Sequence, residues 1–172
     1  GQAQDAAEMI KSFRRLAYAP RLFVAQGAAQ PGLLELVGQD AEYAIGISPY
    51  ELRTATRGNA EFVRAYLQKW SAEPGQLATE GYAAGRVLEE AVRRAGAFDQ
   101  ERIRVALAAL ETGTPLGPYK VDANGVQIAA KPLLVQILRG RREIVWPDAL
   151  ATAKLRLPYP AWEERKPLGK GD

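Results

Sequence analysis

The stretch that decides the fold is RLFVAQGAAQPGLLELVGQDAEYAIGI, residues 21–47. Residues 21–25 are a short apolar run between a proline and a glycine, which is typical of a buried strand. Pro31 can begin the first turn of a short helix that runs through residue 36. Residues 43–47 are a second strand of the buried type. Because strand, helix and strand follow one another, the sequence predicts an α/β fold with a parallel sheet.

Outward from this stretch the alternation continues in both directions. An amphipathic helix is expected over residues 5–18. After residue 50 the pattern predicts helices over residues 59–70, 77–95 and 100–110, and strands over residues 117–122, 133–138 and 143–146. The last two strands are expected to form an antiparallel hairpin across residues 139–142. The tail, residues 157–169, is rich in proline and charge and is expected to wrap the surface without regular structure.

The composition excludes several classes of site. The chain has 172 residues, 47% of them hydrophobic and 25% charged, which excludes wholesale disorder. It has no cysteine and no histidine, so disulfides, histidine-based catalysis and Cys/His metal sites are impossible. No serine lies in a nucleophile elbow, and Glu89 and Arg93 have the spacing of a solvated ion pair on a helix. We therefore expect no catalytic residue, no metal and no cofactor.

The charge pattern also argues against nucleic-acid binding. The net charge is only +3, and the positive residues are spread along the chain rather than gathered in a stripe. The first residues, GQAQD, have neither an initiator methionine nor the basic region of a signal peptide. We expect the chain to be either processed or a piece of a longer protein.

Two polar segments mark a candidate ligand site. In open α/β sheets, ligands bind just beyond the carboxyl ends of the strands. Residues 26–28, beginning with Gln26 and Gly27, follow the first strand of the quoted stretch, and residues 2–4, beginning with Gln2, precede the first helix. A glutamine can orient a polar ligand without burying a charge. The alternative is that these glutamines are ordinary polar loop residues.

Several segments resemble one family, the type I periplasmic solute-binding proteins of ABC importers, in the leucine/isoleucine/valine-binding branch. The segments are residues 14–27, the Gly81-Tyr82-Ala83-Ala84 helix with residues 91–96, Gly117-Pro118-Tyr119 through Asn124-Gly125, Val145-Trp146-Pro147, and residues 160–165. The likeness covers nearly the whole chain but only the C-terminal half of the family's usual length.

The resemblance implies the periplasmic-binding-protein type I fold, with parallel sheets flanked by helices in two part-lobes, truncated at the N-terminus. Residues 1–50 would be the end of lobe two, and residues 51–130 the C-terminal part of lobe one. Residues 131–172 would cross back to lobe two and form the tail. In the family, the ligand lies in the cleft between the lobes.

The resemblance also implies which residues contact the ligand: Gln2, Gln26, Gly27 and Leu77, the last at an apolar cleft position. Amino-acid binders often have an acidic residue at the position of Gln26, because an α-ammonium group needs a charge-assisted partner. The position of Gln2 is often aromatic. These differences put an amino acid in doubt and leave amides and aromatic or aliphatic acids open as ligands.

The function implied by the resemblance is that of a non-catalytic, periplasmic solute-binding component that delivers a small polar ligand to the membrane permease of an ABC importer. The full-length precursor would then have a signal peptide. The alternative is a ligand-sensing domain of a regulatory or receptor protein with the same fold. Because part-lobes leave apolar surface uncovered, a dimer or domain-swapped assembly is also expected.

Overall fold

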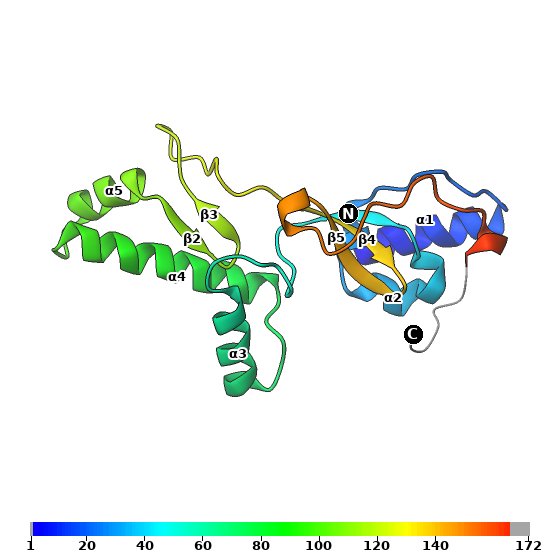
Figure 1. The fold of residues 1–172 in the computed structure, drawn as a ribbon, viewed down its shortest axis with the longest axis horizontal. Coiled ribbons are helices and arrows are strands. Elements are labelled where there is room, and N and C mark those ends of the chain that lie inside the picture. Colours follow the sequence, from blue (N-terminus) through cyan, green and yellow to red (C-terminus); the bar gives the residue numbers. More distant parts are fainter. Residues whose placement is uncertain (1, 166–172) are drawn as a thin grey trace. The chain divides into compact units, whose positions relative to one another are not determined.

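The computed structural model describes residues 2–165 and divides the chain into two compact units (Figure 1). One unit runs to Ser48 and resumes at Leu133, and the other comprises Pro49–Pro132. Their assignment to lobe two and lobe one of the family stays a prediction. None of the helices within residues 2–165 is long and apolar enough to cross a membrane. The predicted end of the tail, residues 166–169, lies outside the described residues.

The first unit combines helices with an antiparallel sheet. Helices α1 (Ala3–Arg15) and α2 (Gly32–Val37) precede strand β1 (Ile45–Ser48), and the chain returns as β4 (Leu133–Leu138) and β5 (Arg141–Trp146). Short 3-10 helices occupy Gln26–Ala29, Gly38–Ala41, Asp148–Leu150 and Trp162–Glu164. The strand order is β1-β4-β5, and both pairings are antiparallel. The predicted α/β class is therefore confirmed, although these named strands are not parallel to one another.

The parallel pairing predicted for the quoted stretch exists, but it is much shorter than expected. Val24 and Ile45 form an isolated parallel bridge. Ala25 N–H donates to the Ile45 carbonyl at 3.0 Å, and Ile45 N–H donates to the Phe23 carbonyl at 3.1 Å. The chain then turns directly into the 3-10 helix at Gln26, so residues 21–25 have no room for a longer ladder. The predicted parallel direction of residues 21–25 is therefore correct, but the predicted length of the strand was wrong.

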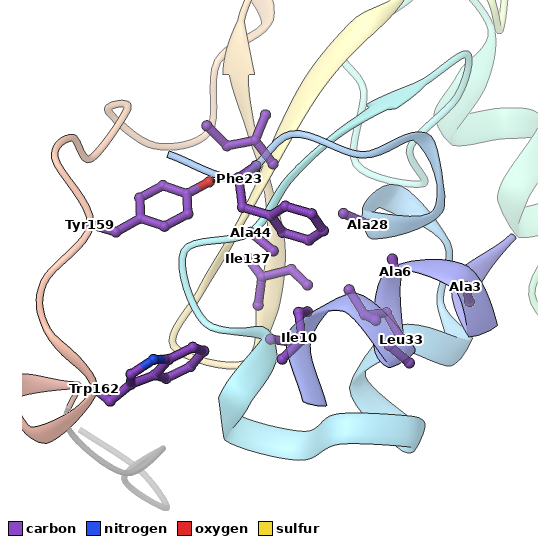
Figure 2. Close-up of a cluster of buried hydrophobic side chains, with 13 residues drawn as sticks. Ala3, Ala6, Ile10, Phe23, Ala28, Leu33, Ala44, Ile137, Tyr159 and Trp162 are labelled. Atoms are coloured by element: carbon purple, nitrogen blue, oxygen red, sulfur yellow. Dashed lines mark hydrogen bonds between the residues drawn. The ribbon is translucent and has the colours of Figure 1, made fainter. Parts of the chain in front are cut away.

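The core of the first unit lies against the alanine-rich face of α1. Ala3, Ala6 and Ile10 recur at helical spacing and are buried together with Leu33 and Ile137. Figure 2 shows these side chains gathered beside Phe23 and Ala28. Since alanine side chains are small, the backbone of α1 can approach the neighbouring segments closely.

The tail contributes to this core, which corrects the sequence-based expectation that it only wraps the surface. Tyr159 and Trp162 are both buried in the same cluster (Figure 2). The Tyr159 hydroxyl donates to the Phe23 carbonyl at 2.7 Å, and Trp162 Nε1 donates to the Tyr18 carbonyl at 2.9 Å. Both aromatic residues lie in a segment rich in charge and proline, and this composition hides their burial.

The predicted hairpin is confirmed. Leu138 pairs with Arg141, so a two-residue loop of Arg139 and Gly140 connects β4 to β5. Both loop residues have positive φ, 54° and 67°, as the primed turns of tight hairpins require. The buried carboxylate of Glu42 accepts hydrogen bonds from both loop N–H groups.

The second unit is mainly helical. It contains α3 (Asn59–Trp70), α4 (Gln76–Ala95) and α5 (Gln100–Ala109), followed by the hairpin of β2 (Thr112–Thr114) and β3 (Gly117–Tyr119). Figure 1 shows α5 beside one end of α4. The boundaries predicted for these helices differ from the observed ones by at most a residue.

The strands of this unit were predicted less well. Strand β2 was missed because three residues with a central glycine give no period-two pattern. The strand predicted over residues 117–122 ends at Tyr119. Beyond it, the Asp122 carboxylate accepts backbone N–H groups of Asn124 and Val126, both at 2.9 Å. The pairing around this turn is limited to an isolated antiparallel bridge between Val121 and Gln127.

Candidate functional site

The candidate site begins where residues 21–25 end. Gln26 directly follows Ala25, whose N–H is the last donor to Ile45, and it opens the 3-10 helix Gln26–Ala29. The Gln26 side chain is exposed, whereas Gly27 is buried. Gln26 therefore occupies the carboxyl end of the short parallel bridge.

Gly27 brings this turn into contact with the start of α1. A Cβ atom at Gly27 would lie 2.0 Å from the backbone oxygen of Gln2 and 3.1 Å from the nitrogen of Ala3. Only a residue without a side chain allows this approach. Because Gln26 precedes Gly27 in the chain, the contact places the backbones of Gln2, Gln26 and Gly27 near the start of α1, on an edge of the first unit that we call the rim.

A residue that the sequence did not suggest completes the rim. Gln30 Oε1 accepts the Ala3 N–H at 2.8 Å, and Gln30 Nε2 donates to Gln2 Oε1 at 3.2 Å. Gln2 N–H in turn donates to Asp5 Oδ2 at 2.7 Å, which fixes the backbone at the start of α1. Gln30 is 28 residues from Gln2 along the chain, so no spacing pattern could have shown this pair.

The glutamine rim, Gln2, Gln26 and Gln30, offers neutral amide groups. Amides can donate and accept hydrogen bonds, but they cannot neutralise an ionic ligand group or act as a nucleophile. Within residues 2–165, no group of three or more His, Cys, Asp or Glu residues is arranged to hold a metal ion. The arrangement is suited to orienting a polar ligand rather than to transforming it.

Leu77, the remaining predicted site residue, belongs to the other unit. It is the second residue of α4, and the residue is 81% exposed. Its place opposite the glutamine rim stays a prediction.

A buried polar network lies earlier in the second unit. The Tyr50 hydroxyl donates to Asn59 Oδ1 at 2.9 Å, and Asn59 Nδ2 donates to the carbonyls of Leu52 and Thr54 at 3.0 and 2.9 Å. Burial raises the pKa of the Tyr50 hydroxyl, so this side chain stays protonated as a donor. The network fixes the turn that leads into α3.

Comparison with known proteins decides the family. Residues 1–141 match the family model described as periplasmic binding protein. The chain belongs to this family. It is 31% identical over 153 residues to Leu/Ile/Val-binding protein homolog 7 of Brucella abortus, a match that covers 82% of the chain and 38% of that relative. The chain thus spans well under half the length of this relative.

Solved structures of periplasmic binding proteins have the same fold. A leucine-binding protein of Thermotoga maritima is 27% identical with a TM-score of 0.67, over 84% of this chain and 41% of that one. A solute-binding protein of R. palustris in complex with benzoate is 21% identical with a TM-score of 0.55, over 97% and 49%. The type I fold and the branched-chain amino-acid branch inferred from the sequence are confirmed. The family comprises solute-binding proteins and not enzymes, as expected.

Proposed function

We propose that the polypeptide containing this chain is the solute-binding component of an ABC importer and acts in the periplasm. The observation that best supports this is the match of residues 1–141 to periplasmic binding proteins, together with relatives named for leucine, isoleucine and valine. On this proposal, a membrane permease is the partner that receives the ligand. The ligand is a small polar organic molecule that contacts Gln2, Gln26 and Gly27, with Leu77 as an apolar contact.

The chemistry of the rim narrows the class of ligand that it can bind. A free α-amino acid presents an ammonium group, which is best bound by a carboxylate. The exposed residue at the end of the parallel bridge is Gln26, and its amide can donate to an oxygen but cannot neutralise a cation. The ligand group at Gln26 is therefore neutral or anionic, as in an amide or a carboxylic acid.

Calorimetric titration of the complete polypeptide tests this function. The panel contains amino acids, their amides, and aliphatic and aromatic acids. Loss of one hydrogen bond to a ligand costs about 0.5–1.5 kcal/mol, or up to about 3 when the ligand group is charged. We expect Gln26→Ala to weaken binding by roughly three- to a hundredfold. Gln39→Ala, at an exposed glutamine of the 3-10 helix Gly38–Ala41, is the matched control and should leave the affinity unchanged.

Association of two chains is a further part of the proposal. Large apolar side chains are exposed on the second unit, with Leu77 at 81% and Phe98 at 95%. Exposed apolar surface of this kind commonly marks an interaction surface. Sedimentation of the 172-residue chain should show a dimer, and a monomer at all concentrations would refute this part alone.

A further inference from the structure

The contacts of Gln30 determine the orientation of two side-chain amides, first its own and then that of Gln2. A backbone N–H can only donate, so the Gln30 atom that lies 2.8 Å from Ala3 N must be the oxygen. The NH2 end of Gln30 is then directed to Gln2. Since that end can only donate, the Gln2 atom 3.2 Å away must be an oxygen too.

The remaining end of the Gln2 amide is its NH2 group. The Gln2 residue is exposed, so this group can be reached from solvent. The Ala3 N–H therefore sets, through Gln30, which hydrogen-bonding group the rim presents at Gln2. Gln2 also forms the capping box of α1 with Asp5, in which its side chain accepts from the Asp5 N–H. Without Gln30, the Gln2 amide loses the side-chain donor that holds its oxygen end.

We propose that Gln30 is a specificity-determining positioning residue, which holds the Gln2 amide so that its N–H donors face the ligand. The inference rests on the proposed function, and it adds the class of ligand group recognised at Gln2. That group is a hydrogen-bond acceptor, namely a carboxylate or carbonyl oxygen. An ammonium group has only donors and is selected against at this point of the rim.

Gln30→Glu reverses the orientation without removing the contact to α1. One carboxylate oxygen accepts the Ala3 N–H, and a negative charge at the start of a helix is favourable, so the variant is expected to fold. The other oxygen can only accept, and it therefore turns the NH2 end of Gln2 toward itself. The Gln2 oxygen then faces the ligand, and the preference changes from acceptor to donor groups.

Two probes with one hydrocarbon skeleton measure this preference in the complete polypeptide. They are 4-methylpentanoate, which is leucine without its ammonium group, and 3-methylbutylamine, which is leucine without its carboxylate. We expect the wild type to favour the acid. We expect Gln30→Glu to shift the ratio of the two dissociation constants toward the amine by about ten- to a hundredfold.

Two controls separate the orientation of Gln2 from the added charge. Gln39→Glu introduces the same charge near Asp40, whose carboxylate pairs with Arg14 at the far end of α1, about 18 Å from its start. This variant should leave the ratio unchanged. In a Gln2→Ala background, Gln30→Glu should also have no effect, because the amide that it rotates is absent.

The outcomes distinguish the inference from the proposed function. If the ratio of the two dissociation constants changes less than threefold in Gln30→Glu while the probes still bind, the inference is wrong. It is also wrong if the change persists in the Gln2→Ala background. If neither probe nor any member of the titration panel binds the wild type, the proposed function is refuted. Hydrogen exchange then tests the contact on which the inferred orientation depends, since the Ala3 N–H should exchange faster in Gln30→Met than in the wild type. Equal exchange overturns it.

Discussion

Replacing Gly27 by alanine tests the contact on which the glutamine rim is built. The added Cβ would lie 2.0 Å from the Gln2 carbonyl oxygen, whereas ordinary contacts begin at 3.4 Å. The obstacle is backbone, which cannot rotate away as a flexible side chain does. Gly27 does not have a positive φ, so alanine is compatible with its local conformation and the cost is that of the clash alone. The start of α1 must then move away from the turn by more than an ångström.

Overpacking of this kind costs about 1–3 kcal/mol. For a chain of this length, that lowers Tm by about 2–12 °C in a thermal melt followed by circular dichroism. Gly32→Ala is the matched control, because a Cβ there would lie 3.8 Å from the Ala3 side chain, in ordinary contact with the same helix. That variant should be as stable as the wild type or more stable by about 0.4–1 kcal/mol. If both variants melt at the same temperature, α1 does not pack on this turn as we describe.

Three further predictions concern single side chains that hydrogen-bond to the backbone. Burial raises the pKa of the Tyr159 hydroxyl to about 12. This hydroxyl therefore ionises at a lower pH in the unfolded chain than in the folded one. The stability of the wild type should fall as the pH rises from about 10 to 12. Tyr159→Phe, which lacks the bond to Phe23, should be about 0.5–1.5 kcal/mol less stable at neutral pH, and thermal melts should show this gap closing in alkali. Gln136 is fully buried, and Gln136→Leu removes the partner of three partly buried backbone groups, the Tyr43 carbonyl and the Arg156 carbonyl and N–H; this should cost about 1–3 kcal/mol in urea denaturation. Asp99→Ala removes the N-cap acceptor of Arg102 N–H and should destabilise the second unit by about 0.5–2 kcal/mol, whereas Asp99→Asn should retain most of the cap in the same assay.

The sequence predicted those elements whose causes are local. Asp99 caps α5, and Gly96 ends α4 with a φ of 65°, so both boundaries could be read from single residues. The hairpin between β4 and β5 follows from two apolar runs and a glycine-containing turn between them. In contrast, the length of the ladder at Val24 depends on where the chain turns afterwards. The burial of Tyr159 likewise depends on a core formed by residues far away in sequence.

The candidate site also combines features that are local in the sequence with features that arise only from tertiary packing. Gln2 and Gln26 could be proposed because strand ends and helix starts are recognisable, but the contact that joins them is made by Gly27, which has no side chain to suggest it. Gln30 enters the rim only when the alanine face of α1 packs closely enough for the Ala3 N–H to reach it. Its role therefore arises from tertiary packing and not from any local pattern. Because the orientation of Gln2 depends on that packing, a substitution on the buried face of α1 that shifts its first turn should alter ligand preference without touching a glutamine.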